Sequence, residues 1–319
     1  MESVAPGRSV GEARATRWVE AQRGLQRRFE EYVLTLRLLV RRPLAAAGLA
    51  ITLAYLLTAV AASFLPDRDV LSIEDPSNVF PQAPFWWLGG GKAGSWLGTT
   101  YPGIDLASAI FKAIRVDLYY STVVVLGGAV IGSLVGLVAG YKGRFYDEAL
   151  MRTTDVTFSI PFLVFAIAVA FVLGRDFATL NLVLLILWWP PYARLVRAQV
   201  LSVKENKFVE AARAAGASDT RIMFRHILPN TLAPVFVQIS LDLGVVIQIF
   251  AALIFIGFSP QGSFAPELGA LISDGFQNGG VTSYPWTIIF PGLALLIFSV
   301  GVNLLGDGLR DVLDPRLRK

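Results

Sequence analysis

The chain has 319 residues, of which 54% are hydrophobic and only 16% are charged. Because soluble domains carry about a quarter of charged residues, this composition indicates an integral membrane protein. The absence of cysteine and the presence of a single histidine, His226, exclude disulfides and thiolate metal sites, and the modest net charge of +4 gives no reason to expect nucleic-acid binding.

The first 43 residues are polar and rich in arginine, and they lack the apolar core and cleavage site of a signal peptide. We expect a cytoplasmic N-terminal segment here. Residues 29–40 suit an amphipathic helix on the membrane surface, whereas residues 1–23 fit a disordered basic tail equally well. Arg41 and Arg42 directly precede the first predicted span, residues 44–64, and place its start in the cytoplasm.

A long connection, residues 65–117, follows the first span. It is rich in proline and glycine, and its first part has more acidic than basic residues. We therefore expect an extracytoplasmic loop. Its residues Trp86, Trp87 and Trp96 either lie at the membrane interface or contact an external partner.

Residues 118–306 are expected to form the transmembrane core. Gly128, Gly132, Gly136 and Gly140 recur at a four-residue spacing in the second span, and such small residues allow another helix to approach closely. The predicted spans are 118–140, 156–173, 177–192, 232–258 and 286–305. Because the fourth contains two successive prolines, its helix either ends at 192 or continues toward the cytoplasm.

Charge alternates along these spans. Residues 141–155 and 193–230 and the tail, 307–319, carry lysine and arginine, whereas 259–285 contains neither. By the positive-inside rule, both termini are cytoplasmic. The sequence therefore predicts an all-α integral membrane fold of about six transmembrane helices, without a soluble domain. It contains no phosphate-binding glycine loop of the P-loop type, so we expect no ATPase site in this chain.

One polar stretch, residues 201–230, interrupts the apolar core. Its alanines favour a helix, and Gly216 suits the C-terminal cap because glycine adopts the left-handed conformation without strain. Ser218 or Asp219 can cap a second short helix, which Pro229 is expected to stop. This unit of two short helices and a sharp turn suits docking against a soluble partner.

The same stretch resembles the EAA motif of ATP-binding-cassette (ABC) importer permeases. The matching residues are Glu210, Ala211, Ala212, Gly216, Leu228 and Pro229. His226 stands where the general pattern has isoleucine, and this form resembles the dipeptide and oligopeptide subgroup. Residues 190–197, 285–292 and 303–316 also resemble that subgroup, the last of them its C-type subunit. Before the second span, however, the subgroup has charged residues where this chain has Thr100, Ile104 and Ala109, so the outer region need not handle the same ligand.

The resemblance implies a type I ABC importer permease for di- or oligopeptides, with oligosaccharides or nickel as alternative substrates. The implied partners are a second homologous permease subunit, two cytoplasmic ATP-binding subunits, an extracellular solute-binding protein and membrane lipid. ATP and magnesium would bind to the partner subunits, so we expect no cofactor and no enzyme activity in this chain. Residues 201–230 would form the coupling loop that receives the motion of the ATPase.

Within this loop, Glu210 is expected to make a charge-assisted contact across the joint or within the loop, the alternative being a solvated surface charge. Ala211 and Ala212 would permit close packing, and Gly216 would set the angle between the helices. His226 has no neighbouring ligand residues in the sequence, so we favour a structural hydrogen bond over pH sensing or metal binding.

Two polar residues, Gln238 and Asp242, lie one turn apart inside the fifth span. A carboxylate there is costly and faces either the translocation pathway, the partner permease or the cytoplasmic end of the span. Two other classes of function are less consistent with the sequence. An intramembrane enzyme would need a paired base or a metal cluster, and a passive channel would not need a coupling loop.

Overall fold

Long helices dominate the structure, a computed structural model that describes residues 37–64, 80–86, 95–258 and 267–313. In chain order the elements are α2 (Pro43–Ala62), β1 (Thr99–Thr100), β2 (Ile104–Asp105), α4 (Leu106–Lys142), α5 (Arg144–Ser159), α6 (Phe162–Leu173), α7 (Phe177–Val203), α8 (Lys207–Ala214), α9 (Asp219–Arg221), the π-helix η1 (Ile222–Ile227), α10 (Leu228–Phe255), α11 (Leu268–Gln277) and α12 (Trp286–Leu313). The predictions for residues 1–36, for Trp87 and for the tail beyond 313 concern residues outside the described ranges.

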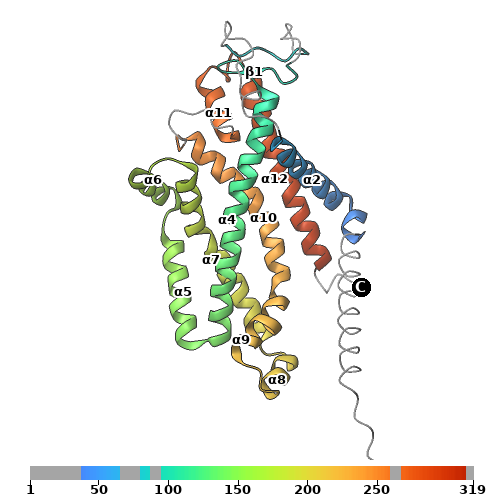
Figure 1. The fold of residues 1–319 in the computed structure, drawn as a ribbon, viewed down its shortest axis with the longest axis vertical. Helices are drawn as coiled ribbons and strands as arrows, with labels where there is room; N and C mark the ends of the chain where they lie inside the picture. The colour runs from blue at the N-terminus through green and yellow to red at the C-terminus, as the bar shows by residue number, and fades with distance from the viewer. Residues whose placement is uncertain (1–36, 65–79, 87–94, 259–266, 314–319) are drawn as a thin grey trace, which may run out of the picture.

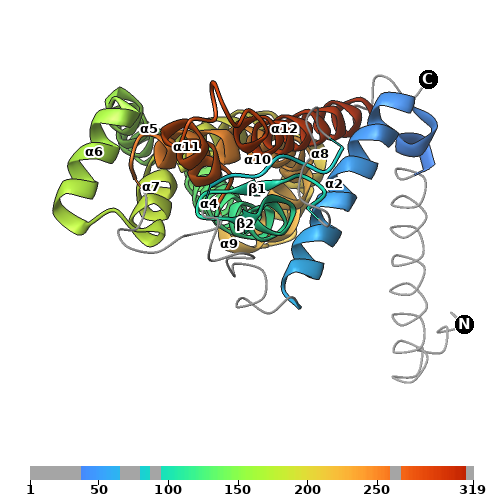
Figure 2. The same cartoon turned by 90° about the horizontal axis from the view of Figure 1, so that it is seen from above.

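Within the described residues, five helical segments are long and apolar enough to cross a membrane, namely α2, α4, α7, the continuous stretch Asp219–Phe255 and α12. The bent pair α5 and α6 gives a sixth if it counts as one span. The prediction of an all-α fold with about six spans is therefore confirmed. Figure 1 shows α4, α7 and α10 running lengthwise, while α2 leans away at a strong tilt that is also visible in Figure 2.

α4 begins at Leu106, well before the predicted start at residue 118. The carboxylate of Asp105 accepts a hydrogen bond of 2.8 Å from the backbone N–H of Ser108 and so caps the first turn. The boundary expected at residue 117 therefore lies inside a helix, and the predicted loop is shorter than 65–117. The boundary expected at 306 also lies inside a helix, because α12 continues to Leu313.

The third predicted span, 156–173, is wrong as a single helix. α5 and α6 meet at an angle of 83° across a break of two residues, Ile160 and Pro161. Proline disfavours a helical conformation in the residue before it, and Ile160 is accordingly extended, with φ −78° and ψ 118°. α7 behaves differently, since it continues to Val203 with both of its prolines inside the helix.

The apolar core consists of three clusters that follow one another along α4. The first gathers Leu106 and Leu118 with Leu268 of α11 and Phe298 of α12. The second packs Val124 of α4 against α6, α7 and α10. The third joins the last turns of α4 and α7 to the polar stretch 201–230. α4 and α10 thus both contribute to every cluster.

The predicted glycine face of α4 packs against α7. A Cβ atom on Gly128 would lie 3.1 Å from the backbone oxygen of Trp188, and one on Gly140 would lie 2.8 Å from the side chain of Val200. A Cβ atom on Gly132 or Gly136 would clash with backbone atoms of α7. The close helix approach expected from the four-residue spacing is confirmed, because no larger residue fits at this interface.

We expect Gly132→Ala to reduce the free energy of unfolding by about 1–3 kcal/mol, because the added methyl group overlaps the backbone of α7. Gly292→Ala is the matched control, since nothing lies within 4 Å of a Cβ atom there. In the control the higher helix propensity of alanine is expected to stabilise α12 slightly. Thermal unfolding of the purified variants measures both effects, and equal stability of the two variants would contradict the prediction.

Candidate functional site

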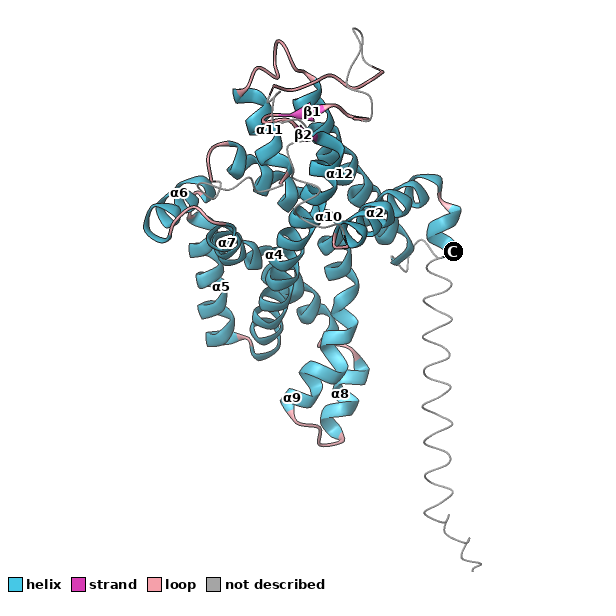
Figure 3. Ribbon diagram, turned by 45° about the horizontal axis from the view of Figure 1, so that its top comes forward, coloured by secondary structure: helices cyan, strands magenta, loops and turns pink. Residues whose placement is uncertain are grey.

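The polar stretch 201–230 forms the tip of the molecule at the end opposite the β1–β2 hairpin. Figures 1 and 3 show α8 and α9 side by side at this tip, beyond the end of α4. The chain enters it from α7, which ends at Val203, and leaves it through η1 into α10. The tip therefore joins two of the long helices directly.

α8 presents one fixed face and one free face. Val209 is fully buried in the third apolar cluster together with Val200 and Ile222, and Ala212 packs against the same cluster. Glu210 and Ala211 are exposed on the opposite face. The packing that holds α8 thus leaves the glutamate and first alanine of the motif available to another molecule.

Gly216 ends α8 in a Schellman motif. Its φ of +78° lies in the left-handed region, where a residue with a side chain is strained. The N–H of Gly216 donates to the carbonyl of Arg213 at 3.0 Å, and the N–H of Ala217 donates to the carbonyl of Ala212 at 3.1 Å. The predicted C-terminal cap is confirmed, and it gives the turn after α8 a defined geometry.

The second half of the predicted unit is wrong in two respects. The side chains of Ser218 and Asp219 make no capping hydrogen bond, and Pro229 does not stop the helix, which continues from Asp219 to Phe255. A π-helical segment precedes Pro229, and the N–H of Leu228 donates to the carbonyl of Met223 five residues back. Pro229 then lies in the first turn of α10, where its missing N–H removes little.

The end of α4 is tied to the tip by two polar contacts. The hydroxyl of Tyr141 donates to Oδ1 of Asp219 at 2.7 Å, and Nζ of Lys204 donates to the carbonyl of Gly140 at 3.0 Å. Tyr141 and Asp219 also line a polar pocket of about 320 Å³ together with Arg213. Sequence reasoning missed these contacts, because Tyr141 and Asp219 are 78 residues apart.

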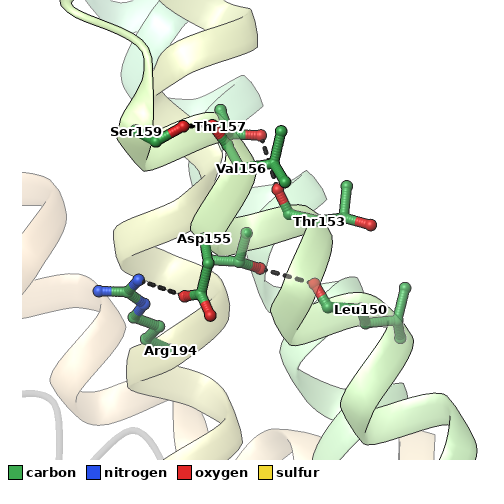
Figure 4. Close-up of polar contacts among 8 residues, drawn as sticks. Leu150, Thr153, Asp155, Val156, Thr157, Ser159 and Arg194 are labelled. Carbon is green, nitrogen blue, oxygen red and sulfur yellow. Dashed lines mark hydrogen bonds and ion pairs between the residues drawn. The ribbon is translucent and has the colours of Figure 1, made fainter.

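Two ion pairs between α5 and α7 lie near the same end. Nε and Nη2 of Arg197 donate to the two carboxylate oxygens of Asp147 at 2.5 and 2.7 Å. Nη2 of Arg194 donates to Oδ1 of Asp155 at 2.6 Å, as Figure 4 shows. Sequence reasoning used these arginines only as indicators of membrane orientation. The signal that sequence reasoning missed was the presence of Asp147 and Asp155 eight positions apart on α5.

Asp242 is buried between α7 and α10, with 7% of its surface exposed. Its Oδ2 accepts a hydrogen bond from Nε1 of Trp188 at 3.0 Å, and its Oδ1 accepts one from Nε2 of Gln238 at 2.8 Å. Gln238 and Asp242, one turn apart on α10 as expected, thus contact each other directly. Both carboxylate oxygens have donors within this chain, and a role in translocation stays a prediction.

The remaining motif residues lie in and after η1. His226 is half-buried, and its backbone carbonyl accepts a hydrogen bond of 2.6 Å from Nδ2 of Asn230. Among the described residues, its imidazole makes no hydrogen bond, so the expected structural bond of this side chain is not found there. Leu228 packs against the third apolar cluster, and Pro229 is exposed.

Residues 132–319 match the family described as binding-protein-dependent transport system inner membrane component. A dipeptide transport system permease protein, DppC, from Alkalihalophilus pseudofirmus is 37% identical over 280 residues, which cover 88% of this chain and 88% of the relative. A glutathione transport system permease protein, GsiD, from Pectobacterium atrosepticum is 38% identical and covers 72% of this chain and 75% of that protein.

Among solved structures, the chain is similar to one of the MetNI methionine ABC transporter in an inward-facing conformation. The TM-score is 0.51 at 22% identity, and the likeness covers 65% of this chain and 97% of the other. This likeness indicates the fold alone, which is that of a type I permease. The chain therefore belongs to the family of binding-protein-dependent transport system inner membrane components, and it is the multi-pass permease component of an ABC importer.

Proposed function

We propose that the tip 201–230 is the coupling loop through which two cytoplasmic ATP-binding subunits drive this permease. The observation that carries the proposal is the division of α8 into a buried face around Val209 and an exposed face with Glu210 and Ala211. A helix held in this way suits a groove on a soluble subunit. Under this proposal the tip and both termini are cytoplasmic, in line with the positive charge of these segments.

The tip is built to transmit motion as a rigid unit. The Schellman motif at Gly216 fixes the turn, and the cluster around Val209 joins α8 to α7 and η1. The Tyr141–Asp219 hydrogen bond adds α4 to the same unit. A displacement of α8 by a closing ATPase dimer would therefore move three long helices together. ATP and magnesium bind to the partner subunits in this scheme, and hydrolysis takes place there.

We further propose that the substrate is a di- or oligopeptide, delivered by an extracellular solute-binding protein to a pair formed with a second, homologous permease. The dipeptide and glutathione transport systems to which the two similar permeases belong support this class. The residues that depart from the subgroup pattern, Thr100, Ile104 and Ala109, are all buried. They act in internal packing and do not argue against a peptide. Binding of peptides, oligosaccharides and nickel to the solute-binding protein separates the alternatives.

We expect Glu210→Lys combined with Gly216→Pro to abolish the co-purification of the two ATP-binding subunits. The first change reverses the charge of the exposed face, and proline cannot adopt the φ of +78° found at Gly216. The retained ATPase, measured by quantitative pull-down, is expected to fall about tenfold or more, or about 1.4 kcal/mol of binding free energy. Glu148→Lys, on the exposed surface of α5, is the control. Undiminished recovery with the double variant would count against the docking role.

We expect Tyr141→Phe to lower transport per ATP hydrolysed while the ATP-binding subunits still co-purify. The change removes one hydrogen bond to Asp219, which contributes about 1 kcal/mol, and frees the end of α4 from the tip. Tyr146→Phe is the matched control, because Tyr146 lines the same pocket and its ring contact with Lys142 survives the change. Uptake into vesicles and ATPase rate are measured together, and an unchanged ratio would contradict the coupling role of Tyr141.

We also propose that Asp242 and Gln238 border the translocation pathway, where a cationic peptide terminus could pass. Asp242→Asn is expected to reduce transport and substrate-stimulated ATPase activity, because the charge is lost and the amide cannot accept from both Trp188 and Gln238. Trp188→Phe removes one of these donors and keeps the charge. If the two variants behave alike, the effect is structural, and if Asp242→Asn changes neither activity, the pathway role is abandoned.

A further inference from the structure

Two carboxyl groups meet inside the first apolar cluster, where α4 passes the start of α11. Asp117 of α4 and Glu267, the residue that precedes α11, are both fully buried. Their sequence neighbours Ile114, Leu118 and Leu268 belong to the cluster itself. Burial of an ionised carboxylate is costly unless it is paired or fully hydrogen-bonded, so this junction needs a physical explanation.

Each carboxyl group has one oxygen with a donor and one without. Oδ2 of Asp117 accepts from the backbone N–H of Leu268 at 3.3 Å, and Oε2 of Glu267 accepts from the N–H of Ala270 at 2.7 Å. Oδ1 of Asp117 and Oε1 of Glu267 are buried and accept no hydrogen bond. Because Leu268 directly follows Glu267 in the chain, its hydrogen bond to Asp117 places the two carboxyl groups next to each other, where a further hydrogen bond could join them. Two ionised carboxylates cannot form that bond, because neither carries a donor.

Within the described part of the chain, no cation compensates the charge of this pair. Among the described residues, Glu267 is the only ionisable group that interacts electrostatically or by hydrogen bonding with Asp117. Asp117 is likewise the only one that interacts with Glu267. The other titratable or charged groups on the elements packed around the junction are Tyr55 of α2, Tyr101 and Asp105 of the hairpin, Lys112, Arg115, Tyr119, Tyr120, Tyr141 and Lys142 of α4, Tyr192, Arg194 and Arg197 of α7, Asp242 of α10, Asp274 of α11, and Asp307, Arg310 and Asp311 of α12. None of these acts on the pair, and Asp274 is held separately by Thr100 and Asn278.

We propose that Asp117 and Glu267 form a buried proton-binding site, in which one proton bridges Oδ1 and Oε1 and fastens α11 to α4. The shared proton supplies the donor that both unpaired oxygens lack and halves the buried charge. Paired carboxyl groups in other proteins retain one proton for the same electrostatic reason. The site lies far along α4 from the coupling tip and does not depend on the proposed function.

The bound proton makes the attachment of α11 dependent on pH. Burial raises the pKa of Glu267 above its ordinary value. The closed junction therefore binds a proton at a pH where separated carboxyl groups would have lost theirs. Its stability is complete below the ordinary carboxyl pKa and falls as the pH rises through the raised value. Between these two pKa values, where the closed form binds one more proton than the open form, the equilibrium constant for opening rises about tenfold for each pH unit.

Infrared spectroscopy of the assembled transporter in lipid nanodiscs tests the site directly. The unmodified complex is expected to show the carbonyl stretch of a protonated carboxylic acid at neutral pH. Asp117→Asn and Glu267→Gln should each remove this band, because the amide donates the bridging hydrogen bond and the remaining carboxyl group ionises. Asp307→Asn, an exposed carboxylate of α12, is the matched control and should keep the band. Absence of the band, or its survival in both single variants, would overturn the proposal.

Hydrogen–deuterium exchange gives a second readout that needs no variant. After correction for intrinsic exchange, the amides of residues 267–277 should exchange faster as the pH rises in the unmodified complex, by about tenfold per pH unit between the ordinary carboxyl pKa and the raised pKa of the closed junction. In Asp117→Asn and Glu267→Gln this dependence should vanish while protection at neutral pH is retained. Exchange of α11 that does not depend on pH in the unmodified complex contradicts a bridging proton, even if a variant fails to fold.

Discussion

The close contact between α4 and α7 is the constraint on which the rest of the structure depends. Both helices are apolar, and lipid offers no hydrophobic drive to bring them together, so the contact must be made by packing of backbone against backbone. Glycines at four-residue intervals allow this along the whole interface, from Gly128 to Gly140. Because α4 also contributes to all three apolar clusters, its position relative to α7 determines where the hairpin end and the tip lie.

The same contact gives the tip its mechanical character. α7 leads directly into α8, while α4 reaches the tip through Lys204 and through the Tyr141–Asp219 bond. On the other flank, α5 is held to α7 by the carboxylates that pair with Arg194 and Arg197. The exposed pair Arg194–Asp155 contributes little stability, about 0–1 kcal/mol, and the part-buried pair Arg197–Asp147 holds α5 through two hydrogen bonds. They fix the orientation of α5 relative to α7. The helix is interrupted at Pro161, so its own backbone does not fix how α5 is oriented relative to α6.

Features that depend on residue type and short-range spacing could be predicted from the sequence. Features that depend on contacts between distant segments could not. The glycine face of α4 and the left-handed cap at Gly216 follow from residue type and spacing, and both are present. Pro229 was misread because a sequence does not reveal that a π-helical turn precedes it and lets the helix continue. At Pro161 the error was the reverse, because a single span was predicted where the chain bends. Hydropathy depends on composition and contains no information on the angle between two apolar helices. The partner of Tyr141 was not predictable at all from chain position.

The buried acids show how far tertiary context decides the chemistry of a residue. Asp242 and Asp117 both lie within long apolar helices, although the sequence placed Asp117 at the end of the predicted loop 65–117. Asp242 meets an indole N–H and a side-chain amide, so each of its two carboxylate oxygens has a donor within the chain. On Asp117, one oxygen accepts from a backbone N–H, and the other is buried without a donor, as is Oε1 of Glu267. At Asp117, the donor that the protein does not supply must come from a proton. This difference makes Asp242 a candidate for contact with a passing ligand and Asp117 part of a proton-bridged contact between helices.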